Sequence, residues 1–291
     1  MQGFIVVNAF YRSEEYLYQA ERLREEFSLR GVSTEIIPAD RLSLRIENGE
    51  IVSRLSGYDF CVFWDKDKYL SSLLTKTGLR LFNPAASIEI CDDKTSTYIE
   101  LTGHGIPMPK TIPGLLCFND NEHIPSSTLE RAETLGYPLI IKECRSSLGQ
   151  GVYLVKNREE LLSVADEVKC KPHLYQEYVE SSCGKDVRVI VVGKSPVGAM
   201  LRTGQKDFRS NVCSGGNAEP YPLTKELIDL SKKIASVLKL DYCGIDFLFG
   251  KDGPVVCEVN SNAFFCAFER VTGINVAKKY VDHVLRVMTK K

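Results

Sequence analysis

Long apolar runs, a large net charge and C-x-x-C cysteine pairs are all missing from this sequence. The longest apolar runs, such as residues 189–192, are far too short to span a bilayer, and residues 1–8 carry no recognisable secretion signal. The 37 basic and 38 acidic side chains balance, so no global field attracts nucleic acid or an anionic membrane. We therefore expect neither a membrane nor a nucleic acid as a partner.

The 10 cysteines are scattered along the chain, and no C-x-x-C pair occurs among them. This spacing argues against a zinc motif, and a chain of 291 residues is long enough to do without a disulfide framework. Cysteines within apolar segments are expected to act as small core residues, while Cys183 and Cys213 lie in loop-like contexts. A reducing cytoplasm is the expected location.

Two patterns of secondary structure follow one another along the chain. Over residues 1–88, apolar strand segments alternate with helical ones, which predicts an open α/β domain with a parallel sheet. Residues 85–105 favour a helical stretch that ends at two prolines. A small α+β unit is expected over residues 139–177, and longer antiparallel strands from Asp186 onward.

An apolar hairpin in the C-terminal part carries the most informative side chains. Two apolar runs flank a Gly-Lys-Asp-Gly-Pro turn, which predicts two antiparallel strands. If Phe249 pairs with Val255, Asp246 falls opposite Glu258, and Asn260 lies beside Glu258 on the same face. Two carboxylates so near each other repel unless a positive charge neutralises them. Hard oxygen ligands of this kind suit Mg²⁺. The pattern predicts a metal platform for a nucleotide; the alternative is a strand with solvent-facing acids.

A lysine and a glycine-rich loop are candidates for phosphate binding. Lys142 ends an apolar strand, and Gly149-Gln150-Gly151 follows it. Glycines let backbone N–H groups approach phosphate oxygens, and lysine supplies a point charge. The loop is neither a Walker A loop nor a G-x-G-x-x-G fingerprint, so a plain hairpin turn is an equal alternative. Lys94 is a weaker candidate, because most helix lysines are solvated.

Further polar residues follow apolar strands and could contact a nucleotide. The backbone groups that could bind an adenine edge belong to Gln176, Glu177, Tyr178 and Val179. Asp186 could accept from ribose hydroxyls or simply cap a strand. Arg202 precedes a polar segment that contains Arg209 and Asn211. Arginine beside a metal–phosphate site stabilises charge that develops during group transfer, whereas the alternative is a basic surface loop.

Taken in order, these motifs resemble the ATP-grasp superfamily, and most closely its RimK group of glutamate ligases. The motifs are Asp93-Lys94, Gly105-Ile106-Pro107, Ile141-Lys142, Gly149-Gln150-Gly151-Val152, Gln176-Glu177-Tyr178-Val179, Asp186-Val187-Arg188, Asp207-Phe208-Arg209-Ser210-Asn211, Gly215-Gly216, Gly244-Ile245-Asp246, Glu258-Val259-Asn260 and Thr272-Gly273-Ile274. Each alone is unspecific. The D-F-R-S-N run, in order with the Asp and Glu-x-Asn set, is specific.

The resemblance implies the fold class and the layout of the chain. An α/β N-terminal domain (1–88) is expected, followed by a two-part α+β ATP-grasp fold. Its parts are linker helices with a central lid (89–176) and a C-terminal catalytic part (177–291). ATP is expected to lie between these last two parts, under a mobile cover formed by residues 149–151.

The resemblance also implies a role for each candidate residue. Lys94 and Lys142 are expected to contact phosphates. Adenine is expected on the backbone of Glu177 and Val179, the ribose on Asp186, and the γ-phosphate or the acyl phosphate beside Arg209 and Asn211. Arg202 is counted with them as a candidate catalytic residue. Asp246, Glu258 and Asn260 are expected to bind Mg²⁺ as two ions, with Mn²⁺ as a substitute.

The implied reaction is ATP-dependent ligation of a carboxylate to an amine through an acyl phosphate, with ADP as a product. At least one substrate is expected to be an amino acid, added in the manner of glutamate to a peptide, a protein or a small metabolite. The loop after Asn260 departs from the family, because Phe264 and Phe265 replace a proline and glycine loop. These aromatics either shape the acceptor pocket or pack a following helix, so both substrates and the number of residues added stay open.

Two other functions are compatible with the sequence. One is a small-molecule ligase that resembles glutathione synthetase or D-alanine–D-alanine ligase. The other belongs to a different class, a nucleotide-binding regulator without turnover. The sequence is also compatible with a homo-oligomer, and it leaves the contribution of the N-terminal domain to acceptor binding open.

Overall fold

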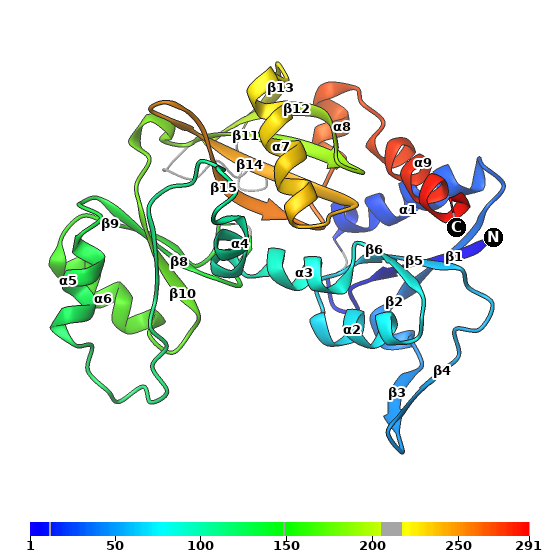
Figure 1. The fold of residues 1–291 in the computed structure, drawn as a ribbon, viewed down its shortest axis with the longest axis horizontal. Coiled ribbons are helices and arrows are strands. Elements are labelled where there is room, and N and C mark those ends of the chain that lie inside the picture. The colour runs from blue at the N-terminus through cyan, green and yellow to red at the C-terminus, as the bar shows by residue number, and fades with distance from the viewer. Residues whose placement is uncertain (12, 148, 205–216, 291) are drawn as a thin grey trace.

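Three sheets arranged in a row form the body of the molecule in the computed structural model, which describes residues 1–11, 13–147, 149–204 and 217–290 (Figure 1). No helix in these described ranges is both long and apolar enough to cross a lipid bilayer. The polar segment that includes Arg209, Asn211 and Cys213 lies outside the described residues.

The N-terminal part is a parallel sheet in the order β2-β1-β5-β6, as the sequence predicts. Its elements are β1 (Gln2–Val7), α1 (Glu14–Ser28), β2 (Ser33–Pro38), η1 (Ala39–Arg41), β3 (Leu44–Glu47), β4 (Glu50–Ser53), β5 (Phe60–Trp64), α2 (Lys68–Lys76) and β6 (Arg80–Phe82). Ile5 and Val7 pack in one cluster with α1, while Phe4 and Val6 pack in another with Leu74 of α2. Helices α1 and α2 therefore cover opposite faces of this sheet.

The middle part differs from the sequence prediction in three places. Its elements are α3 (Ala85–Asp92), α4 (Lys94–Leu101), β7 (Thr111–Pro113), α5 (Ser126–Glu133), β8 (Leu139–Glu143), β9 (Val152–Val155), α6 (Arg158–Val168) and β10 (His173–Glu177). The single helical stretch predicted over residues 85–105 is two helices, because Asp93 leaves helical geometry and accepts a 3.0 Å hydrogen bond from the Ser96 backbone N. Strand β7 and helix α5 were not predicted.

The C-terminal part is an antiparallel sheet in the order β13-β12-β11-β14-β15. Its elements are η2 (Glu180–Ser182), β11 (Lys185–Val192), β12 (Ser195–Thr203), β13 (Asn217–Tyr221), α7 (Lys225–Val237), β14 (Tyr242–Gly250), β15 (Gly253–Asn260), α8 (Cys266–Thr272) and α9 (Val276–Thr289). Helix α7 shares a core cluster with this sheet.

The register of the β14–β15 hairpin confirms one predicted pair and corrects another. Asp246 lies opposite Glu258, as predicted, but Phe249 pairs with Pro254 rather than with Val255. A register shift after Asp246 makes Cys257 the extra residue of a bulge, which restores the Asp246–Glu258 pair. The predicted face is therefore correct, although the turn-proximal register is off by one residue.

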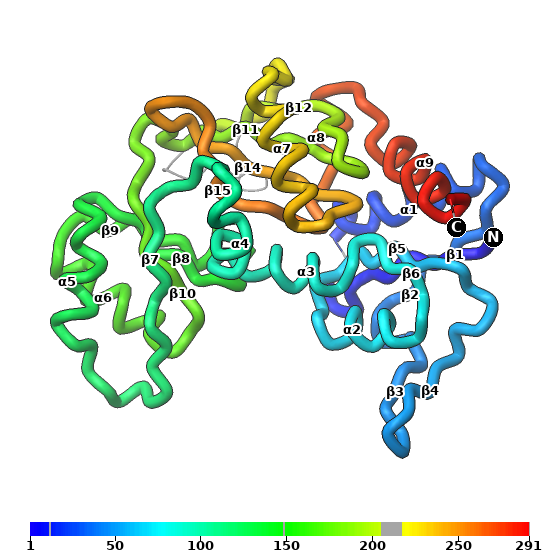
Figure 2. The backbone as a smooth tube through the Cα atoms, viewed as in Figure 1, coloured from blue at the N-terminus to red at the C-terminus, as the bar shows by residue number. Residues whose placement is uncertain are grey.

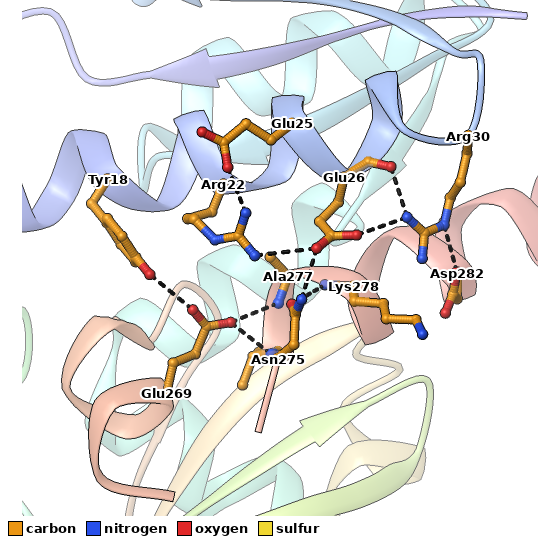
Figure 3. A network of polar contacts seen from close by, with 11 residues as sticks. Tyr18, Arg22, Glu25, Glu26, Arg30, Glu269, Asn275, Ala277, Lys278 and Asp282 are labelled. Atoms are coloured by element: carbon orange, nitrogen blue, oxygen red, sulfur yellow. Dashed lines mark hydrogen bonds and ion pairs between the residues drawn. The ribbon is translucent and has the colours of Figure 1, made fainter. Parts of the chain in front are cut away.

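The chain returns at its end to the N-terminal sheet, where α9 lies beside α1 (Figures 1 and 2). Polar contacts tie the two together (Figure 3): Glu26 pairs with Arg22 and Arg30 at 3.1 and 2.8 Å and accepts from Asn275 Nδ2 at 2.7 Å. Glu269 accepts from the Tyr18 hydroxyl at 3.0 Å. One apolar cluster combines side chains of α1, β1 and β5 with those of β14 and α9, so these two parts share a core.

Candidate functional site

A cleft of about 570 Å³ is lined by side chains from all three parts of the molecule. It brings together most of the residues that the sequence singled out. These are Lys94, Lys142, Gly149, Gln150, Gln176, Glu177, Tyr178, Val179, Asp186, Arg202, Asp246, Glu258 and Asn260. Gly151 is outside this lining, and Arg209 and Asn211 fall outside the described residues.

Asp246 is the centre of a buried ion-pair network on the sheet β11–β12–β14. Arg188 donates from Nε and Nη2 to its two carboxylate oxygens, both at 2.7 Å, and Arg202 Nη2 lies 2.8 Å from Oδ2. Arg202 also forms a bidentate pair with Asp186, with both distances at 2.6 Å. The strand register explains this, because Arg188 lies opposite Asp246 and Arg202 opposite Asp186.

Charge neutralisation determines the protonation state of this network. Burial alone would raise the pKa of Asp246, but the charges and hydrogen bonds of Arg188 and Arg202 outweigh it and lower the pKa to about 2. Burial would lower the pKa of Arg202, and Asp246 and Asp186 together raise it above its ordinary value. Asp246 and Arg202 are therefore both ionised at neutral pH.

Glu258 and Asn260 line the same wall of the cleft, and their side-chain oxygens could bind a cation. The Glu258 side chain is 30% exposed and lies 3.5 Å from Lys94 Nζ. The Asn260 amide nitrogen is buried and has no hydrogen-bond partner among the described residues. Two carboxylates and an amide form the donor set that Mg²⁺ prefers, and the described chain offers no cluster of three His, Cys, Asp or Glu side chains as a rival.

Two buried lysines face this acidic wall. Lys94 donates to the Ser146 carbonyl at 2.7 Å, and Lys142 donates to Cys257 Sγ at 3.6 Å. Burial by itself would lower the pKa of Lys142, but neighbouring Cys257, Tyr98 and Glu258 raise it above its ordinary value. The Lys142 ammonium thus stays charged, and both lysines lie where their Nζ atoms could bind phosphate oxygens.

The loop between β8 and β9 requires its glycines. Gly149 and Gly151 have positive φ values of 77° and 61°, which side chains other than glycine rarely adopt. The Gly151 carbonyl accepts from the Glu143 backbone N at 2.8 Å, which closes the hairpin behind the cleft. The turn interpretation therefore holds for Gly151, while Gly149 and Gln150 face the cleft.

The residues at the end of β10 use their side chains to hold strand β7. Gln176 Nε2 donates to Thr111 Oγ1, and the Glu177 carboxylate accepts from the Lys110 backbone N, both at 2.8 Å. These contacts fix the position of the backbone that was predicted to bind adenine. The adenine contact itself stays a prediction.

The aromatic loop after Asn260 divides its side chains between the core and the cleft. Phe265 and Phe268 are fully buried in the shared core, as expected for packing a following helix. Phe264 instead lines the cleft and packs on Tyr11 and Tyr16 of the N-terminal part, with ring centroids 6.4 and 5.8 Å apart. Packing therefore accounts for Phe265 and Phe268, while a role of Phe264 in shaping the acceptor pocket stays a prediction.

Several residues of the cleft were missed at the level of sequence. Asn8, Asp65, Lys66 and Arg188 line it, although no role was assigned to them. Asn8 and Asp65 each come directly after a buried parallel strand. Side chains at the carboxyl ends of such strands commonly line ligand sites, so this position was the available signal.

Known proteins resemble this chain over most of its length. Residues 91–284 match the family model of the RimK-like ATP-grasp domain. The chain is 32% identical over 283 residues to N-acetylaspartylglutamate synthase A of Mus musculus, which covers 91% of this chain and 73% of that protein. It is 30% identical over 285 residues to a probable alpha-L-glutamate ligase of Halorhodospira halophila, covering 93% and 92%.

Solved structures share the fold and confirm the expected fold class. A RimK domain ATP-grasp protein of Sphaerobacter thermophilus superposes with a TM-score of 0.74 at 21% identity, covering 97% of this chain and 99% of that one. The D-alanine–D-alanine ligase of Bacillus anthracis gives 0.74 at 17% identity, covering 100% and 99%. Together with the family match, these similarities establish that the chain belongs to the RimK-like ATP-grasp family.

Proposed function

We propose that this ATP-grasp ligase joins a carboxylate to the amine of an amino acid through an acyl phosphate. The observation that carries the proposal is one wall of the cleft, where Asp246, Glu258 and Asn260 face Lys94 and Lys142. Oxygen ligands for a divalent cation and fixed positive charges for phosphates are the two requirements of phosphoryl transfer from ATP. The proposed division of the chain is 1–88, 89–176 and 177–291, with the cleft supplied by all three parts.

The proposed roles follow from the position of each group. Glu258, Asn260 and Asp246 hold Mg²⁺, as one or two ions, which when bound offsets the negative charge of the triphosphate. Lys94 and Lys142 bind phosphate oxygens from the opposite side. Arg202, ionised and paired with Asp186 and Asp246, would stabilise charge that develops on the transferred phosphate. Arg209 and Asn211 remain proposed phosphate contacts, as the sequence motif implies.

We propose glutamate as the amino acid that is added. Three groups of relatives support it by their names: N-acetylaspartylglutamate synthase, beta-citrylglutamate synthase and alpha-L-glutamate ligase. Glutamate is their common element, whereas the partner substrate differs among them. The partner substrate of this chain is therefore not transferred from any one of these proteins.

The decisive test is Mg²⁺-dependent ADP release, with amino acids supplied singly and in pairs. A Glu258→Gln variant is expected to lose about a hundredfold or more of this activity, because it removes a charged oxygen ligand. Glu50→Gln, at the exposed first residue of strand β4, makes the same charge change outside the lining of the cleft and serves as the control. Undiminished turnover in the Glu258 variant would refute the metal-ligand assignment.

A further inference from the structure

Asp65 is a buried carboxylate in the cleft whose charge meets no cation in the described part of the chain. It is 6% exposed and lines the cleft. Its hydrogen-bond donors are neutral: Asn8 Nδ2 lies 3.2 Å from each oxygen, and the Lys66 backbone N lies 2.6 Å from Oδ1. Burial raises the pKa of Asp65, and hydrogen bonds from Lys66 and Asn8 oppose this effect. Burying a carboxylate without a counterion is costly, so retaining one in a ligand cleft needs an explanation.

The neighbouring lysine does not supply the missing charge. Lys66 Nζ turns to Asp92 and to the Ser147 hydroxyl, both at 3.1 Å. Glu15, at the start of α1, adds a second carboxylate to the lining of the cleft. The N-terminal part therefore contributes two carboxylates to the cleft, whose proposed phosphate end is where Lys94 and Lys142 lie.

Asn8 holds the Asp65 carboxylate in a fixed orientation. Its side-chain oxygen accepts from the Phe10 and Tyr11 backbone N atoms, both at 2.9 Å, which leaves its amide nitrogen to face Asp65. Asn8 follows β1 and Asp65 follows β5, which are adjacent parallel strands. Because α1 and α2 cover opposite faces of the sheet, the strand order reverses between β1 and β5. Ligands bind in the crevice at such a switch point.

An aromatic wall lies beside this acidic point. Tyr11 packs on Tyr16 with ring centroids 5.3 Å apart, and Phe264 from the C-terminal part completes the group. Tyr11 is exposed, whereas Tyr16 is buried and its hydroxyl donates to the Trp64 carbonyl at 2.5 Å. Aromatic faces next to a carboxylate suit a primary ammonium group attached to a carbon chain.

Resting on the proposed ligase function, we propose that Asp65 binds the ammonium group of a substrate, an unacylated amino acid or peptide. Asn8 acts as the positioning residue, and Tyr11, Tyr16 and Phe264 contact the carbon skeleton. The substrate's carboxylate can then point along the cleft toward the phosphate end. An N-acylated substrate has no charge to place at Asp65 and binds more weakly.

The single tryptophan gives a readout that does not depend on turnover, because Trp64 directly precedes Asp65. Standard amino acids and dipeptides, each with its N-acetyl counterpart, are titrated against Trp64 emission in the full chain without ATP. A free-amine probe is expected to bind about ten- to hundredfold more tightly than its N-acetyl form, as one charge-assisted contact predicts. Asp65→Asn should abolish this preference, while Asp67→Asn, whose carboxylate caps α2 by accepting from the Leu70 backbone N, should retain it.

Equal binding of free and N-acetylated probes, wild-type behaviour of Asp65→Asn, or no response to any free-amine probe would overturn the inference. The comparison in the unmodified protein needs no variant, so it decides the question even if Asp65→Asn does not fold. ADP release with N-acetylated substrates alone would leave the ligase function standing and refute the role of Asp65. Asp65-dependent amine binding without any ADP release would leave the role of Asp65 standing and refute the ligase function.

Discussion

Asp246 is both a proposed metal ligand and the ion-pair partner of two arginines, whereas Glu258 is chiefly a proposed metal ligand. Comparing Asp246→Asn with Glu258→Gln therefore tests the structural role separately from metal binding. Both are proposed metal ligands, so Asp246→Asn and Glu258→Gln should each abolish Mg²⁺-dependent ADP formation. Only Asp246 is also a structural partner, being 3% exposed and contacted by two arginines at 2.7 to 2.8 Å. The asparagine keeps the shape of the side chain and removes the charge that Arg188 and Arg202 need.

The structure sets the size of the expected loss of stability. A shift of the Asp246 pKa from 3.8 to about 2 corresponds to roughly 2 kcal/mol. Removing one partner of a buried ion pair costs ~3–5 kcal/mol, because the other charge stays buried. We therefore expect Asp246→Asn to lower the free energy of unfolding by about 2–5 kcal/mol. Glu258→Gln should cost under ~1 kcal/mol, since its one ion pair, with Lys94, is 3.5 Å long and partly exposed.

Urea unfolding of both variants and the wild type at neutral pH measures this difference. The pH dependence gives a second check. The folded-state pKa of Asp246 lies below its ordinary value, so its stabilisation is present above about pH 4 and is lost as the pH falls toward 2. The difference in free energy of unfolding between the wild type and Asp246→Asn should therefore become smaller as the pH falls from about 4 toward 2. Equal free energies of unfolding for Asp246→Asn and Glu258→Gln at neutral pH would refute the reasoning. So would a difference between the wild type and Asp246→Asn that grows in acid.

Three further predictions test the site and the fold. Lys142→Met should weaken ATP binding about tenfold or more, measured by calorimetry, because it removes a buried charge from the proposed phosphate site. Unchanged affinity would exclude that role. Glu26→Gln should lower the free energy of unfolding by ~1–3 kcal/mol, because it removes the charge that pairs with Arg22 and Arg30. Glu25→Gln is the control: its side chain is 58% exposed, and the free energy of unfolding should change by no more than about 0.5 kcal/mol. Equal changes in the two variants would refute a stabilising role of the α1–α9 network. Gly244→Ala should lower the free energy of unfolding in urea by ~1–3 kcal/mol, since the new methyl would lie 2.5 Å from Ala263 Cβ. An unchanged free energy would mean that the segment around Ala263 moves to accommodate the methyl.

Local sequence patterns were sufficient for most of the secondary structure, but not for its interruptions. The N-cap Ser13 and the apolar run of β14 are signals carried by neighbouring residues, and the structure follows them. The break at Asp93 was missed, because aspartate inside a helical pattern also occurs within helices. The short strand β7 was missed as well, since its pairing with β10 depends on residues more than sixty positions away.

The bulge at Cys257 shows how a correct site can follow from an incorrect register. The prediction placed Asp246 opposite Glu258 by counting from the turn, and the turn pairing was wrong by one residue. The extra residue on β15 cancelled that error before the site was reached. No local pattern signals such a bulge, because its position is fixed by how the two strands twist against the rest of the sheet.

The order of the motifs by itself determined the family, the fold class and most candidate ATP and metal ligands, since each motif is a short run of residues. Tertiary structure alone decided which charges neutralise one another: Arg188 meets Asp246, which is 58 positions away. It also decided that Phe264 faces the cleft while Phe265 is buried in the core, and that Asn8 lies beside Asp65. These outcomes depend on strand order and on burial against distant elements, and pairwise electrostatic and packing energies of that kind leave no signature in a linear pattern.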